Sequence, residues 1–262
     1  GRNATVLIGS PDAAPEPTSR WSLGGDLLVG SSEAQGESTV VVHRTGEIAS
    51  TGVGAAVRLR ETSTLAGGGR IAMNVLVEGG RVAPLDPQTR LPTRLTIAGD
   101  LAVDAGVVRI AVVGTAPGFF DTIAVGGTAR LGGTLEIVFA NGFVPQRGDV
   151  FPFLEVGGAV TGSFAQVRLL GVQQGLPFTL TPSGIVIGAV APRAALPTNA
   201  LVLTALADGV PCAAGDQNGD GVAECETCDD CVDDNANGLV YGADPDCVAP
   251  ADGGGNPLAG TG

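Results

Sequence analysis

The chain has 262 residues and a net charge of −13, from 27 acidic residues against 14 arginines, with no lysine. The imbalance is confined to one end, because residues 1–193 hold 15 acidic residues and all 14 arginines, whereas residues 194–262 hold 12 acidic residues and no arginine. Neither part has the basic face that nucleic acid or an anionic membrane requires, so we expect neither as a partner. No apolar run approaches the roughly 20 residues that cross a bilayer, and we therefore expect no membrane span.

The first 193 residues are predicted to be short strands joined by glycine corners. Alternating, β-branched stretches indicate strands at residues 4–8, 38–43, 94–97, 106–113 and 133–139. Gly-Gly and Gly-Asp steps follow them at short intervals, which excludes long helices and suits tight corners with positive φ. These patterns predict an all-β body.

An internal repeat favours a solenoid. LGGDLLV at residues 23–29 returns as IAGDLAV at residues 97–103, and a looser copy, IAVGGTARL, occupies residues 123–131. Such strands bury their apolar faces by stacking on neighbouring coils, and coils of roughly 20 residues would give the body about nine. We therefore expect a parallel β-helix over residues 1–193, although a β-sandwich also has short strands and regular turns.

Four motifs in order carry a family resemblance: GGRVAP at 79–84, LTIAGDL at 95–101, FDTIAVGGTARLGGTL at 120–135 and FVPQRGDVF at 143–151. Together they resemble the C-terminal portion of bacterial autotransporter passenger domains and related large surface adhesins. The resemblance implies a right-handed parallel β-helix outside the cell. It implies no particular activity, because passengers include adhesins, enzymes and inert stalks.

The remainder of the chain is predicted to be a different module. Residues 192–197 indicate a hinge, and residues 194–211 are predicted to be a linker or a docked strand. Within them, residues 199–206 form either a docked last strand or a short helix. Residues 212–248 hold all five cysteines and two acidic loops, and residues 249–262 are a Gly-rich tail predicted to be flexible. We expect a small, loop-rich calcium and disulfide module at 212–248.

Two loops follow the pattern that binds Ca²⁺, with oxygen ligands at alternate positions, a glycine at the sixth and an acid near the twelfth. The twelfth residue of the first loop is Thr227, so Glu226 or Asp229 would have to close that loop. The predicted ligands of the first loop are Asp216, Asn218, Asp220, the carbonyl of Val222, and Glu224. Those of the second are Asp233, Asn235, Asn237, the carbonyl of Leu239, and Asp244. Solvated acidic turns are the alternative, since Asn, Asp and Gly also dominate ordinary turns. The segment resembles short, Cys-flanked calcium repeats near the C-termini of secreted bacterial surface proteins.

The cysteines allow two interpretations: Cys212, Cys225, Cys228, Cys231 and Cys247 form disulfides, or the last four bind zinc as thiolates. Disulfides are favoured, because the chain has the character of a secreted protein and the neighbouring carboxylates disfavour thiolates. Five is an odd number, so one sulfur is left over for a free thiol or a bond between chains.

Catalytic signals are weak. His43 is the only histidine, lies in an alternating strand and is expected to be structural. Two carboxylate pairs, Asp100 with Asp104 and Asp121 with Glu136, have the residue types of a glycosidase but lie beside glycine corners, where solvated acids are common. We therefore predict no enzymatic activity.

These observations predict an extracellular or cell-surface structural protein, a fibre or adhesin-stalk subunit stabilised by Ca²⁺ and disulfides. The open coil at residues 4–8 is uncharged and favours head-to-tail self-association, with other surface or matrix components as alternative partners. A polysaccharide-binding or polysaccharide-cleaving β-helix and a calcium-dependent surface anchor are the competing functions.

Overall fold

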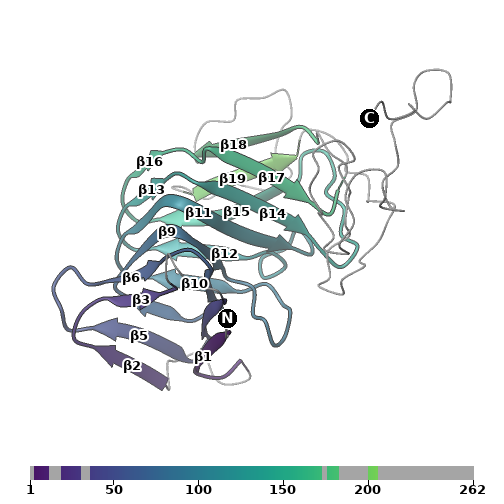
Figure 1. The fold of residues 1–262 in the computed structure, drawn as a ribbon. Helices are drawn as coiled ribbons and strands as arrows, with labels where there is room; N and C mark the ends of the chain where they lie inside the picture. Colours follow the sequence, from purple (N-terminus) through teal and green to yellow (C-terminus); the bar gives the residue numbers. More distant parts are fainter. Residues whose placement is uncertain (1–2, 12–18, 31–35, 173–175, 183–199, 206–262) are drawn as a thin grey trace, which may run out of the picture.

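The computed structural model describes residues 3–11, 19–30, 36–172, 176–182 and 200–205, and within them it contains 19 strands and no helix (Figure 1). The all-β prediction is confirmed. In chain order the strands are β1 Ala4–Ile8, β2 Ser19–Leu23, β3 Leu27–Val29, β4 Ser38–Val42, β5 Gly46–Ser50, β6 Ala56–Leu59, β7 Ser63–Ala66, β8 Arg70–Ala72, β9 Asn74–Ala83, β10 Arg94–Ile97, β11 Leu101–Val112, β12 Thr122–Val125, β13 Ala129–Leu131, β14 Thr134–Phe139, β15 Val150–Val156, β16 Val160–Gly162, β17 Gln166–Leu170, β18 Phe178–Pro182 and β19 Ala200–Ala205.

The strands wind into a parallel β-solenoid of about five turns, which confirms the predicted fold (Figure 1). One side is an eight-stranded sheet, here called sheet B, in the order β2-β5-β8-β10-β12-β15-β19-β18. The 11-stranded sheet covers two further sides, because β9 and β11 are long enough to pair along both. One of these sides holds β1, β4, β7, β14 and β17, and the other holds β3, β6, β13 and β16.

The expectation of about nine coils of roughly 20 residues is wrong, because the coils are longer. On sheet B, Ile48 pairs with Ile71 and Ile71 with Ile97, which are 23 and 26 residues apart. Farther along, Ile97 pairs with Val125 and Val125 with Val156, at separations of 28 and 31 residues. The added residues lie in corner loops such as 113–121 and 140–149, so the body has fewer and larger turns.

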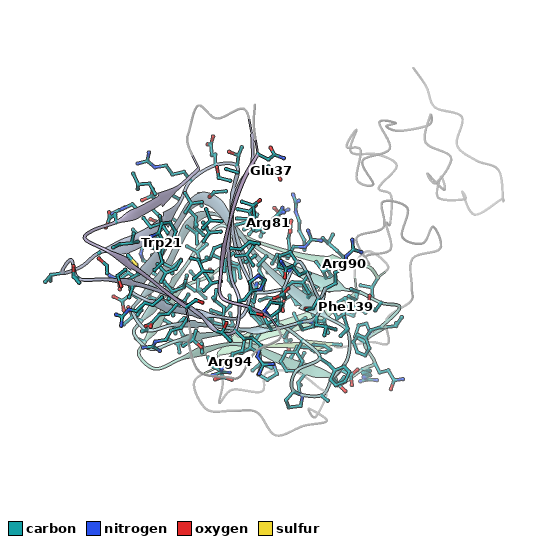
Figure 2. All side chains as sticks on the ribbon, turned by 90° about the horizontal axis from the view of Figure 1, so that it is seen from below. Trp21, Glu37, Arg81, Arg90, Arg94 and Phe139 are labelled. Atoms are coloured by element: carbon teal, nitrogen blue, oxygen red, sulfur yellow. The ribbon has the colours of Figure 1, made fainter. Side chains whose placement is uncertain are left out.

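The core is a stack of aliphatic side chains in register from coil to coil, and side chains fill the interior of the solenoid (Figure 2). On sheet B, Ile48, Ile71 and Ile97 lie directly over one another and are fully buried. Each such side chain stabilises the fold by roughly 1.5–3 kcal/mol relative to exposure. Toward the C-terminal coils the core becomes aromatic, where Phe120 and Phe139 make edge contacts with Phe151.

The repeated Gly-Asp motif forms the corner between sheet B and the side that carries β3. Its acidic side chain accepts a hydrogen bond from the backbone of the next coil, Asp26 from Ala56 at 3.0 Å and Asp100 from Thr128 at 2.7 Å. Two coils lie between them, and in the second of these Asn74 has this role and accepts from the N–H of Asp100 at 2.9 Å. The repeat therefore marks a corner at which a side chain of one coil satisfies a backbone donor of the next.

Glycine is required where β11 bends from one side of the solenoid to the other. Gly106 has a φ of 86°, and the pairing register shifts on both sides of Ala105. A Cβ at Gly106 would overlap the carbonyl oxygen of Gly80 in the coil below. Both the backbone conformation and the close approach of the coils therefore exclude a side chain here.

Sheet B ends in an antiparallel pair. Residues 200–205, expected as a docked strand or a helix, form β19, which lies between β15 and β18 and is antiparallel to both. Leu201 and Leu203 of β19 belong to the buried core. Two backbone hydrogen bonds join the end of β19 to the corner before β15: the Ala205 N–H donates to the Asp149 carbonyl, and the Gly148 N–H donates to the Ala205 carbonyl.

Candidate functional site

The predicted calcium and disulfide module lies outside the described residues. All ten predicted calcium ligands, from Asp216 to Asp244, and all five cysteines, from Cys212 to Cys247, fall within residues 206–262. Among the residues that the structure describes, no group of three or more His, Cys, Asp or Glu side chains is placed to hold a metal ion. The calcium and disulfide assignments therefore remain predictions from the sequence.

The outer face of sheet B carries a row of side chains in register, here called the charge row. Its members, one from each successive parallel strand, are Arg20, Glu47, Arg70, Thr96, Ala124 and Glu155. The first three alternate in charge, and Glu47 contacts Arg20 at 3.8 Å and Arg70 at 3.4 Å. Such cross-strand pairs of opposite charge stabilise neighbouring strands modestly.

The charge row is interrupted by two small residues, and this produces an open hollow of about 660 Å³, here called the sheet B hollow. Thr96 of β10 and Ala124 of β12 lie at its centre, because they occupy the row positions between Arg70 and Glu155. Arg94, two residues before Thr96 on the same face of β10, also lines the hollow and lies at the outer surface (Figure 2).

An ion pair spans β12 beside the hollow. The Arg94 Nη1 and Nη2 atoms donate to the two carboxylate oxygens of Glu155 at 2.9 and 2.6 Å, a bidentate arrangement. The hydrogen bond from Arg94 lowers the pKa of Glu155, and the same bond raises the pKa of Arg94. Glu155 is therefore ionised at neutral pH and acts as a hydrogen-bond acceptor there, not as a proton donor.

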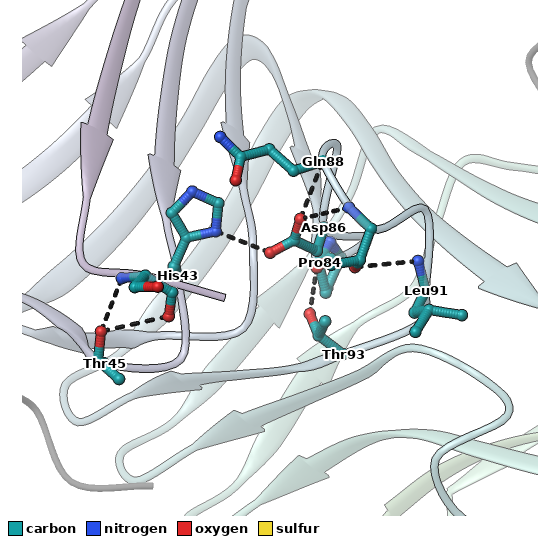
Figure 3. A network of polar contacts seen from close by, with 9 residues as sticks. His43, Thr45, Pro84, Asp86, Gln88, Leu91 and Thr93 are labelled. Atoms are coloured by element: carbon teal, nitrogen blue, oxygen red, sulfur yellow. Dashed lines mark hydrogen bonds and ion pairs between the residues drawn. The ribbon is translucent and has the colours of Figure 1, made fainter. Parts of the chain in front are cut away.

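A second polar cluster lies buried at the corner that leads into sheet B. His43 Nδ1 is 2.7 Å from Asp86 Oδ2, and both side chains are at most 3% exposed (Figure 3). The other Asp86 oxygen accepts the backbone N–H groups of Gln88 and Thr89 at 2.9 and 3.1 Å. This pair links the β4–β5 corner to the 84–93 loop, so His43 has the structural role that was predicted.

The electrostatics of Asp86 follow from these contacts. Burial raises its pKa, but the hydrogen bonds from the Thr89 N–H and from His43 outweigh burial, so the pKa of Asp86 lies below its ordinary value. The loop passes over a corner of three consecutive glycines, residues 67–69, and a Cβ at Gly68 would overlap Thr93. The glycines therefore leave the space through which the 84–93 loop reaches His43.

Asp121 is the most deeply buried carboxyl group of this corner and is fully inaccessible. Its oxygens accept the N–H groups of Thr93 at 2.8 Å and of Ala111 at 2.9 Å. Burial raises the pKa of Asp121 to about 7 in spite of these bonds. Because no solvent reaches it, this group stabilises the corner and is not available to a substrate.

The carboxylate pairs considered from the sequence have structural surroundings. Asp100 accepts from both the N–H and the hydroxyl of Thr128, and Asp104 forms an ion pair with Arg130. Asp121 and Glu136 are both buried, Glu136 at 7% exposure. None of these four groups lines the sheet B hollow.

No protein-family model, no curated protein and no solved structure matches this chain. In the part of the chain that the structure describes, no helix is long and apolar enough to cross a membrane. The inference of function therefore depends on the residues themselves.

Proposed function

We propose that this chain is an extracellular structural protein, a subunit of a fibre or adhesin stalk whose C-terminal module is stabilised by Ca²⁺ and disulfides. The observation that supports it best is the use of the polar groups at the corners. The buried His43, Asp86 and Asp121 bond to neighbouring loops, and the exposed Asp26 and Asp100 bond to the next coil. These groups serve the stacking of coils, which is what an elongated load-bearing body requires.

The N-terminal end supports association through strand edges. β1, β2 and β3 each pair with a single strand among the described elements, and β1 exposes Val6 at 40% and Leu7 at 53%. An uncharged, apolar edge of this kind is a template for pairing with another chain.

The strand directions at the two ends are compatible with head-to-tail stacking. β16 and β17 run parallel to β3 and β1 through the unbroken parallel pairing of their sheet. β18 is antiparallel to β19, which is itself antiparallel to β15, so β18 runs in the same direction as β15 and β2. A second copy placed head-to-tail would therefore continue parallel pairing, and such a heterologous contact extends into a fibre.

The calcium and disulfide part of the proposal is supported by the sequence alone, through the two loops that begin at Asp216 and Asp233. An extracellular location is supported by the resemblance to passenger domains and by the clustered cysteines.

Light scattering and negative-stain electron microscopy of the full chain, in millimolar Ca²⁺, test this proposal. We expect particle mass to rise with concentration and rods or filaments to appear. Val6→Lys places a charge at the open end and should keep the protein monomeric, whereas Val53→Lys, in the fully exposed β5–β6 turn, should assemble normally. A wild-type protein that stays monomeric across the micromolar range contradicts the fibre role.

A further inference from the structure

The sheet B hollow has the form of a small binding site on an otherwise regular face. Outward positions of neighbouring strands carry arginine or glutamate, but Thr96 and Ala124 leave space for a ligand over β10 and β12. The hollow opens at one side onto a glycine corner, where Gly126 stacks against the backbone of Ala98 so closely that a Cβ would overlap it. A ligand can therefore lie over β10 and β12, between Arg70 on one side and the Arg94–Glu155 pair on the other.

The charged groups around the hollow retain hydrogen-bonding capacity. A guanidinium has five N–H donors, and the two bonds to Glu155 use two of those of Arg94. Arg70 contacts Glu47 through Nε, at 3.4 Å. Both arginines are about half exposed, so a ligand anion can reach their guanidinium groups without displacing Glu47 or Glu155.

The lining selects among ligand classes. Two arginines bind carboxylates through their planar forks, while the ionised Glu155 accepts hydrogen bonds from hydroxyl groups. A ligand that matches both carries carboxylates and hydroxyls on one chain. No aromatic side chain lines the hollow, so a neutral sugar has no stacking surface here.

Two other classes fit less well. A peptide strand pairs with a free sheet edge, but the hollow lies over β10 and β12, which are paired on both sides. Nucleic acid needs an extended row of cations, whereas here each arginine is ion-paired with a carboxylate, Arg70 with Glu47 and Arg94 with Glu155. We therefore propose that the sheet B hollow binds a carboxylate-bearing polysaccharide, a glycan that contains uronic acid units. This binding activity goes beyond the structural role and does not depend on fibre formation.

The test is binding of a polygalacturonate oligosaccharide to the full chain, measured by isothermal titration calorimetry. Chelator is present throughout, so that calcium bridging between the ligand and the acidic C-terminal residues contributes nothing. We expect binding to wild type and at least about a tenfold loss in the Arg70→Gln, Arg94→Gln double variant, because charge-assisted hydrogen bonds are removed. Arg58→Gln is the matched control, since Arg58 is equally ion-paired, to Asp26 and Glu78, on another side of the solenoid.

A second variant tests position without changing charge. Ala124→Met fills the centre of the hollow and should also weaken binding at least several-fold, while far-ultraviolet circular dichroism and the melting curve verify its fold. A neutral xylan oligosaccharide should not bind. The proposal is overturned if wild type does not bind polygalacturonate, or if Arg58→Gln loses as much affinity as the double variant. It is also overturned if Ala124→Met binds polygalacturonate with wild-type affinity. Dextran sulfate provides the last test: if wild type and the double variant both bind it as tightly as wild type binds polygalacturonate, the attraction is a nonspecific effect of charge and the proposal is wrong.

Discussion

The buried Asp121 carboxyl group should make the stability of the solenoid depend on pH in an unusual direction. Its pKa is about 7 in the folded protein, because burial outweighs three backbone hydrogen bonds, against 3.8 for the ordinary group. The folded state therefore binds this proton more tightly than the unfolded state. The contribution of Asp121 to stability is fully present below about pH 4 and is lost as the pH rises through about 7.

The magnitude follows from the shift. A difference of about 3 pKa units corresponds to about 4 kcal/mol in total. Most of the titration falls between pH 8 and pH 5, where linkage gives a gain of roughly 2 to 3 kcal/mol on acidification. Asp121→Asn removes the titration. It also leaves one of the two N–H groups, of Thr93 or Ala111, opposite an amide NH₂, which costs stability by an amount that does not depend on pH.

The assay is urea denaturation at several values between pH 5 and pH 8, followed by far-ultraviolet circular dichroism. The stability of wild type minus that of Asp121→Asn should fall by roughly 2 to 3 kcal/mol from pH 5 to pH 8. Taking the difference between the two proteins cancels the titration of the acidic C-terminal residues. Glu155→Gln is the control, because the pKa of Glu155 is lowered and the group stays ionised over this range, so its wild-type-minus-variant difference should be nearly flat from pH 5 to pH 8. A wild-type-minus-variant difference for Asp121→Asn that is flat, or that rises with pH, refutes the reasoning.

Three further predictions concern the corners and the C-terminal module. Gly106→Ala should destabilise the protein by about 3 kcal/mol in the same denaturation assay, and Gly118→Ala by only about 1 kcal/mol. Both glycines have a positive φ, but only at Gly106 would the added Cβ overlap the backbone of a neighbouring coil. Asp86→Ala should cost about 3 kcal/mol, since it leaves His43 buried without its acceptor, and equal stability of the variant would contradict the role of this pair. Chelation should lower the melting temperature and the protease resistance of the C-terminal module. Asp216→Ala should weaken calcium binding in calorimetry while the body stays folded. Identical melting and proteolysis with and without Ca²⁺ would show that the loops are ordinary turns.

The fold was predictable because its local rules are visible along the chain. Alternation located β1 and β10 with their observed bounds, and the Gly-Asp repeat located three copies of the same corner. The number of turns was not predictable in this way, because coil length is set by loops such as 113–121, whose size the strand pattern does not report. Those loops reach across to neighbouring coils, as the 84–93 loop reaches His43.

The sheet B hollow was not found in the sequence for a related reason. Arg70, Thr96, Ala124 and Glu155 are separated by 26, 28 and 31 residues, and only the register between coils places them in one row. An alignment of coils on their inward aliphatic positions, such as Ile97, would have placed these outward residues side by side. The sequence therefore contained the row of outward residues, but finding it required the correct length of each coil.

The two parts of the chain need different sources of order. The body is nearly neutral and buries a continuous hydrophobic stack, so each coil is stabilised by packing on its neighbours. Residues 212–247 hold ten acidic residues, and that much negative charge resists compaction unless divalent cations neutralise it. In the chain this segment follows β19, the strand that joins β15 to β18 at the C-terminal end of sheet B. If this segment binds Ca²⁺ and the chain assembles head-to-tail, as proposed, the net charge of each subunit falls when calcium binds, and assembly should then depend on the concentration of free calcium.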